Sequence, residues 1–213
     1  MNKSFPLGSG RHELPPPMPT VLGSGLVAPA PSLLSALGAP RRSVFISYHH
    51  GDNLLSGDQY YYDQLSRVAS AQFRLMQDNS LDRRVNSTDT NYIIQRIRDK
   101  YITGSSCTIV LCGAHTYQRK YVDWETKATL DKEHGLIGVQ LPTLPVNAQG
   151  RVSPPNRLNL NINSGYAQWI HWTELTASAE SFKRHIEEAF ARSNNASFKS
   201  KIINPLEIKK QNG

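Results

Sequence analysis

Short apolar segments that alternate with helical patterns are the feature that most limits what this chain can fold into. Segments of strand length occupy residues 44–48, 107–112, 136–141 and 167–172, and residues 73–76 form a shorter candidate. Between the strands, side chains at helical spacing such as Ile93, Ile97 and Tyr101 predict amphipathic helices. Asp89 is placed to cap that helix. Further helices are expected up to about residue 132 and around residues 182–190.

Five strands alternating with helices in one domain predict an α/β fold, a parallel sheet with helices on both faces. Five strands also suggest the flavodoxin-like order 2-1-3-4-5. In that order the crevice lies between strands 1 and 3, at their carboxyl ends. The loops that begin at His49 and Gly113 would border this crevice. After residue 141 we expect a Pro- and Asn-rich loop that runs to Gly165.

Charge and proline content separate the two ends from the middle of the chain. The net charge is +7, but residues 1–42 carry +3 of it and residues 199–213 another +3. Because only +1 remains for the middle, we expect no nucleic-acid groove in the folded core. Residues 1–42 also hold eight of the 13 prolines, which is typical of a disordered tail. We therefore divide the chain into a flexible Pro/Gly-rich tail (1–42), one domain (43–198) and a mobile basic C-terminal tail (199–213).

The two cysteines and seven histidines form no metal or disulfide pattern. Cys107 and Cys112 lie five positions apart on one predicted strand, so their side chains point to opposite faces and do not bridge. Their spacing fits no zinc motif. No apolar run reaches the roughly 18 to 20 residues of a membrane span, and the run near Leu33 is too short for a secretory signal. We expect a reduced, cytoplasmic protein that holds no metal and binds no membrane.

Several short motifs resemble, in this order, those of a TIR domain. They are the first strand with Ser47, His49 and His50, then Asp78 and Ser80, the strand at residues 108–111, and the residues Thr116, Arg119, Tyr121, Val122 and Glu125. The last segment is similar to the Thr-x-x-Arg-x-(Trp/Tyr)-Val-x-x-Glu pattern of bacterial TIR-like proteins of Thoeris anti-phage defence. The similarity covers about residues 43–141 and implies a flavodoxin-like TIR fold.

The resemblance implies an enzyme that cleaves the bond between nicotinamide and ribose in NAD+ and makes a cyclic or conjugated ADP-ribose-derived signal. Glu125 matches the catalytic glutamate of such enzymes. The candidate substrate-binding residues are Ser47, His49, His50, Asp78, Ser80 and Tyr121. NAD+ would be a substrate and not a bound redox cofactor, because the chain has no Gly-x-Gly-x-x-Gly fingerprint. A separate effector protein that senses the product is also implied, as is a homo-oligomer that completes the site.

The role of Glu125 depends on where its helix begins. If Thr116 capped the helix, Glu125 would lie roughly 13 Å from the crevice, at 1.5 Å per residue. If the helix begins near Lys120, Glu125 lies within the first two turns and can reach a ribose. We therefore expect the later start. Tyr121 shares the helix face of Glu125 and is the expected stacking ring, whereas Trp124 points about 100° away and is expected in the core.

Other interpretations of the same residues stay open. An isolated glutamate on an amphipathic helix is usually a solvated surface residue, and Asp78 and Ser80 can simply form a turn. A TIR module that assembles partners without catalysis would keep the fold and need no carboxylate in the crevice. An enzyme like the nucleoside deoxyribosyltransferases shares the general fold and a carboxylate near an anomeric carbon. Base exchange on deoxynucleosides would distinguish it from an enzyme that cleaves NAD+.

Overall fold

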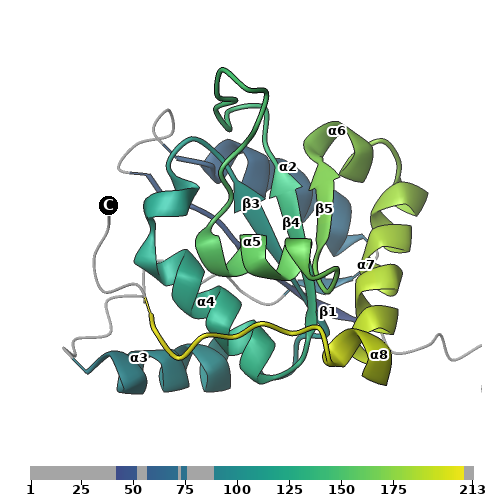
Figure 1. The fold of residues 1–213 in the computed structure, drawn as a ribbon. Helices are drawn as coiled ribbons and strands as arrows, with labels where there is room; N and C mark the ends of the chain where they lie inside the picture. Colours follow the sequence, from purple (N-terminus) through teal and green to yellow (C-terminus); the bar gives the residue numbers. More distant parts are fainter. Residues whose placement is uncertain (1–41, 52–56, 72, 76–88, 209–213) are drawn as a thin grey trace, which may run out of the picture. The chain divides into compact units, whose positions relative to one another are not determined.

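The computed structural model describes residues 42–51, 57–71, 73–75 and 89–208. Five parallel strands form one sheet in the order β2-β1-β3-β4-β5, which confirms the predicted α/β fold and strand order (Figure 1). The strands are β1 Ser43–Ser47, β2 Arg74–Leu75, β3 Cys107–Cys112, β4 Gly135–Gln140 and β5 Gln168–His171. The helices are α2 Gln59–Ser70, α3 Thr90–Ile97, α4 Lys120–Asp131, α5 Asn156–Asn163, α6 Trp172–Leu175, α7 Ala179–Ser193 and α8 Ala196–Lys199. A π-helical turn, Arg98–Ile102, continues α3, and a 3₁₀ turn, Thr116–Gln118, precedes α4.

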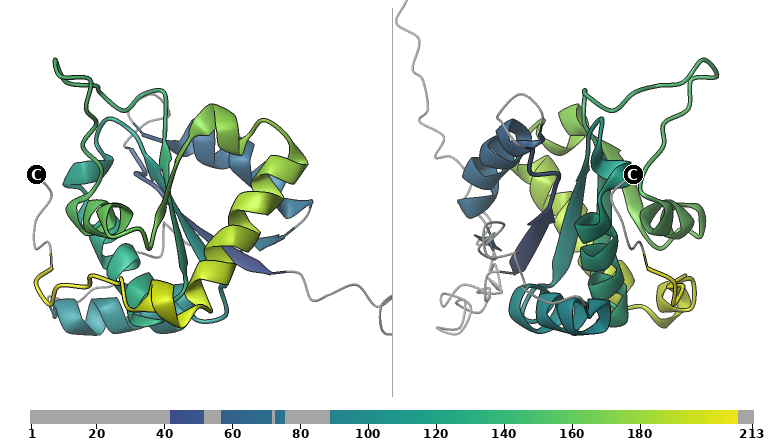
Figure 2. Two further views of the ribbon diagram at one scale, coloured as in Figure 1. Left: turned by 45° about the vertical axis from the view of Figure 1, so that its right-hand side comes forward. Right: turned by 90° about the vertical axis from the view of Figure 1, so that its left-hand side faces the viewer.

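Helices cover both faces of the sheet (Figure 2). Helices α2, α6 and α7 pack on one face, where Val44 and Ile46 of β1 point. Helices α3 and α4 cover the opposite face, where Phe45 points. Burial on both faces explains why the strands read as continuous apolar runs and not as alternating ones.

The two cysteines are unpaired core thiols, as the sequence predicted. Both are free and buried, and they belong to apolar clusters on opposite faces of the sheet. Burial raises the pKa of both thiols. Both therefore stay protonated and behave as small apolar side chains.

The register of β1 and β3 places two loops side by side. Ser47, the last residue of β1, pairs with Val110 of β3, and β3 continues for two more residues to Cys112. The loops that begin at His49 and Gly113 therefore leave the sheet from neighbouring strands. The crevice predicted from the strand order would lie at this edge.

Helix α5 lies where a loop was expected, so the prediction of a continuous loop up to Gly165 is wrong. The asparagines of this segment suggested a loop because asparagine is a weak helix former. Pro155 stands at the N-cap of α5, and a proline at the start of a helix costs little. Leu158 and Asn161 are fully buried, and the Asn161 side chain donates a hydrogen bond to the Arg157 carbonyl at 2.9 Å. Burial and hydrogen bonding thus override the low helix propensity.

Residues 201–208 bind along α5 and α4, so this part of the C-terminal segment is not the mobile tail that its charge suggested (Figure 1). The Asn161 side chain pairs with both backbone groups of Ile203: it donates to the carbonyl at 2.7 Å and accepts from the N–H at 3.0 Å. The Asn204 side chain donates to Asp131 of α4 at 2.8 Å. Residues 201–208 are held in place because buried polar side chains of the domain form hydrogen bonds with their backbone. The net charge of the segment could not predict these contacts.

The described chain begins at Arg42, which belongs to the folded domain. Its guanidinium pairs with Glu187 at 2.8 Å and lies 3.5 Å from the centroid of the Phe190 ring. Residues 1–41, predicted to form a flexible tail, lie outside the described residues.

Candidate active site

A buried contact joins the end of β1 to α4. The hydroxyl of Ser47 donates a hydrogen bond to Oε2 of Glu125 at 2.6 Å. Ser47 is fully buried and Glu125 is 2% exposed, so Glu125 is not the solvated surface residue that an isolated glutamate suggests. Helix α4 begins at Lys120, as expected, and Glu125 therefore lies within its first two turns.

A hydrogen-bonded turn sets the start of α4. The hydroxyl of Thr116 accepts from the Gly113 N–H at 2.8 Å and donates to Oδ2 of Asp58 at 2.9 Å. The backbone N–H of Arg119 donates to the Thr116 carbonyl at 3.1 Å and closes the 3₁₀ turn. Thr116 thus ends the loop after β3 and does not cap α4.

Asp58 is a second carboxylate at this edge of the sheet, and the sequence analysis missed it. It is 4% exposed, and burial raises the pKa of its carboxyl group, opposed by hydrogen bonds from Thr116 and the His49 backbone. Gly113 is needed beside it, because a Cβ there would lie 2.0 Å from Asp58 Oδ1. In the sequence Asp58 looks like the N-cap of α2, but its side chain does not cap that helix. It accepts a hydrogen bond from Thr116 after β3 instead, a contact that helical pattern alone cannot show.

Comparison with known proteins identifies this region. Residues 45–145 match the family model described as Thoeris protein ThsB, TIR-like domain. This chain carries a TIR-like domain of the Thoeris type. The match runs from β1 past β4, so it includes the Ser47–Glu125 contact and the Thr116 turn. A search of curated proteins finds no match.

The two neighbouring histidines, His49 and His50, have different surroundings. His49 is 8% exposed, and its ring lies edge-on to that of His115 in the loop after β3, with centroids 6.1 Å apart. His50 is exposed, and its Nδ1 lies 3.2 Å from the Tyr48 hydroxyl. His49 therefore lies beside the loop after β3, whereas His50 lies against Tyr48, whose ring stacks on Tyr62 of α2.

A chain of hydrogen bonds assigns the tautomer of His50. The Gln59 amide nitrogen donates to Asp63 at 2.8 Å, so its oxygen is left to accept from the Tyr48 hydroxyl at 2.8 Å. The Tyr48 oxygen can then only accept from His50, which places the proton on Nδ1. In the neutral ring, Nε2 of His50 is therefore the acceptor.

Tyr121 and Trp124 pack together on α4. Trp124 is 2% exposed, which confirms that it belongs to the core. The Tyr121 ring meets it edge-on, with centroids 5.0 Å apart, and the Lys120 ammonium lies 5.4 Å and 5.3 Å from the two centroids. Tyr121 therefore has a packing role in the TIR-like domain. Stacking on a substrate stays a prediction for this residue.

Asp78 and Ser80, the remaining substrate-binding candidates, lie outside the described residues. Within the part of the chain that the structure describes, no three His, Cys, Asp or Glu side chains are grouped to hold a metal ion. Of the helices described, none is long and apolar enough to cross a membrane.

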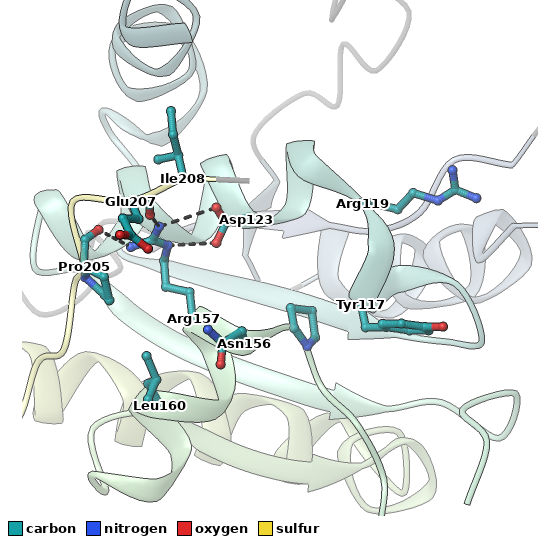
Figure 3. A pocket seen from close by; sticks show the side chains of 10 residues that line it. Tyr117, Arg119, Asp123, Asn156, Arg157, Leu160, Pro205, Glu207 and Ile208 are labelled. Atoms are coloured by element: carbon teal, nitrogen blue, oxygen red, sulfur yellow. Dashed lines mark hydrogen bonds and ion pairs between the residues drawn. The ribbon is translucent and has the colours of Figure 1, made fainter. Parts of the chain in front are cut away.

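A second polar cluster, called here the Arg157 joint, lies on the outer side of α4 (Figure 3). Arg157 is 3% exposed, and its guanidinium donates to both carboxylate oxygens of Asp123 in α4, at 2.9 and 3.4 Å. It also donates to the Asn204 side chain and the Pro205 carbonyl, both at 2.7 Å, and to the Glu207 carbonyl. All five N–H donors of the guanidinium are thereby used.

A pocket of about 390 Å³ lies beside the Arg157 joint, between the start of α4, α5 and the C-terminal segment. Tyr117, Pro155, Leu160 and Ile208 give it an apolar part. Arg119 also lines this pocket, and its guanidinium is directed away from Asp123 and Arg157 (Figure 3).

Proposed function

We propose that this protein cleaves the N-glycosidic bond between nicotinamide and ribose in NAD+ and converts the ADP-ribose part into a cyclic or conjugated signal. In Thoeris-type defence, a separate effector protein would sense this product. The observation that supports the proposal is the oriented Glu125 carboxylate at the carboxyl end of β1, within a TIR-like domain.

The chemistry needs one negative charge near the ribose. Loss of nicotinamide leaves positive charge on the sugar ring, and a carboxylate held nearby stabilises that transition state. Nicotinamide leaves as a neutral base, so no general acid is required. Ser47 donates to Oε2 of Glu125 and fixes the carboxylate in one orientation, which removes the need to reorganise it during the reaction.

A non-catalytic interaction module is the second candidate, and the burial of Glu125 favours it. A carboxylate that is 2% exposed and bonded to Ser47 can also serve as a structural tie between α4 and β1. The family match favours both TIR interpretations over an enzyme like the nucleoside deoxyribosyltransferases.

Substitution of Glu125 by glutamine tests the proposal. Glu125→Gln removes the charge but keeps an acceptor for Ser47, so we expect the free energy of unfolding to change by about 1 kcal/mol or less. Release of nicotinamide from NAD+, followed by mass spectrometry, should fall by about two to three orders of magnitude. Glu180→Gln, an exposed position in α7, is the matched control and should keep the parent rate.

The experiment includes protein purified from phage-challenged cells, because a resting enzyme can be silent. A folded Glu125→Gln protein that cleaves NAD+ at the parent rate would exclude Glu125 from the mechanism. If the parent protein does not cleave NAD+ even after challenge, the interaction module becomes the better conclusion.

A further inference from the structure

Arg119 presents a cation that the described part of the domain does not pair. It lies between the 3₁₀ turn and α4, and its Nε atom is buried without a hydrogen-bond partner. Among the described residues, no carboxylate forms an ion pair with its guanidinium. A guanidinium stays charged at any ordinary pH, and a buried N–H without a partner is costly. Such a side chain is suited to bind an anion.

The guanidinium points away from the Arg157 joint and acts on Asp58, the residue before α2. Figure 3 shows it directed away from Asp123, Arg157 and Tyr117, although Arg119 is one of the residues that line the pocket beside the Arg157 joint. Its charge and that of His115 both lie close enough to Asp58 to lower the pKa of that carboxyl group, against the larger effect of burial. Arg119 thus places a positive charge beside Asp58.

We propose that Arg119 binds the diphosphate of a dinucleotide substrate. This inference rests on the proposed function and names the second group of the substrate that the site recognises. The diphosphate is the anionic part of NAD+, and it is joined directly to the ribose that Glu125 would face. Arg119 and Glu125 lie six residues apart at the start of α4, roughly 9 Å along the helix axis. A guanidinium matches two phosphate oxygens at once, which gives both affinity and orientation.

Binding of ADP and adenosine to the full-length protein, measured by isothermal titration calorimetry, tests the proposal without turnover. The two ligands share the nucleoside, and only ADP carries the diphosphate. The parent protein should bind ADP more tightly than adenosine. Arg119→Gln should weaken ADP binding by about tenfold to a hundredfold, the range expected for hydrogen bonds to a charged group, and leave adenosine binding unchanged.

Two further variants control the interpretation. Arg67→Gln removes the same charge from an exposed position of α2 and should leave the ratio of ADP to adenosine affinity unchanged. Arg119→Lys keeps the charge but loses the two-pronged geometry, so its ADP affinity should fall between those of the parent and Arg119→Gln.

Either of two results would overturn the proposal. One is a parent protein that binds ADP no better than adenosine, and the other is an Arg119→Gln protein that keeps the parent preference for ADP. If Arg119→Gln does not fold, Arg119→Lys decides, and an unchanged ADP affinity there would count against the proposal. Failure of NAD+ cleavage would reject the proposed reaction, while the binding result would still show whether Arg119 holds a diphosphate.

Discussion

Arg157 binds the first turn of α4 through Asp123, Arg119 stands at the N-cap of the same helix, and the two differ in how far their donors are satisfied. Arg157 is buried and donates all five of its N–H groups to Asp123 and the C-terminal segment. Arg119 has a buried Nε without a partner and points away from the Arg157 joint. Both are charged side chains of the same type, but Arg119 directly precedes α4, whereas Arg157 belongs to α5 and reaches α4 at Asp123.

The difference in hydrogen bonding marks Arg157 as part of a structural polar cluster and Arg119 as part of a candidate binding site. A fully satisfied buried network holds elements in place and offers nothing to a ligand. An unsatisfied donor is tolerated where something else completes it. On this argument, the Arg157 joint fixes α4 from outside, and the crevice side of the same helix carries the groups that would meet a substrate.

The same substitution, made separately at Arg157 and at Arg119, should have very different effects on stability, and the loss at Arg157 should be the largest of those predicted. Arg157→Gln leaves the Asp123 carboxylate and the acceptors of the C-terminal segment without their partner, and loss of one member of a buried pair typically costs 3–5 kcal/mol, so we expect about that loss. Arg119→Gln removes an unpaired cation and should change the free energy of unfolding by about 0.5 kcal/mol or less. Urea unfolding of both variants measures the difference, and equal losses would show that the two arginines do not differ in structural role.

Tyr121 packs against the apolar cluster that α3 and α4 share, and its ring should contribute less to the stability of the domain than Arg157. Tyr121→Ala removes a half-buried ring that packs on Trp124 and should destabilise the domain by about 1–2 kcal/mol. NAD+ turnover should fall more in Tyr121→Ala than in Tyr121→Phe, because ring area matters more than the hydroxyl when a ring packs on nicotinamide.

Comparison of the two Tyr121 variants separates packing from substrate contact. Parent rates in both would make Tyr121 a packing residue only. Equal and large losses of turnover would instead give the hydroxyl a role. Melting temperatures measured alongside show whether any loss of rate in Tyr121→Ala follows from unfolding.

The sequence predicted those features of the site that follow from local pattern. Alternating strands and helices placed the loops after β1 and β3 together, and the resemblance singled out Glu125, which the structure brings to Ser47. The later start of α4 was also expected, because Glu125 could reach the crevice only from there.

Features that depend on contacts distant in sequence could not be predicted. Asp58 and Thr116 are 58 residues apart, and Arg157 meets the C-terminal segment 47 to 50 residues away. Asp58 has the local pattern of a helix cap and Asn161 that of a loop residue, because the sequence around each carries no sign of its distant partner. Only the fold shows that all five N–H groups of Arg157 have hydrogen-bond partners and that Nε of Arg119 has none.

The smallest expected effect is a pH dependence at Asp58. Burial raises the pKa of this carboxyl group above the unfolded value of 3.8, so the folded state binds the proton more tightly than the unfolded state. This contribution to stability is fully present below about pH 3.8 and is lost as the pH rises through the folded-state pKa. Asp58→Asn keeps an acceptor for Thr116 but cannot ionise, so its stability should not fall with rising pH through this group.

Urea unfolding of the parent and of Asp58→Asn from pH 4 to pH 8 tests this sign. The free energy of unfolding of the parent, relative to that of the variant, should fall with rising pH and then level off. A difference that rises with pH would mean that the hydrogen bonds from Thr116 and the His49 backbone outweigh burial. Asp58 would then resemble the satisfied carboxylate of the Arg157 joint, and the contrast between the two sides of α4 would rest on Arg119 alone.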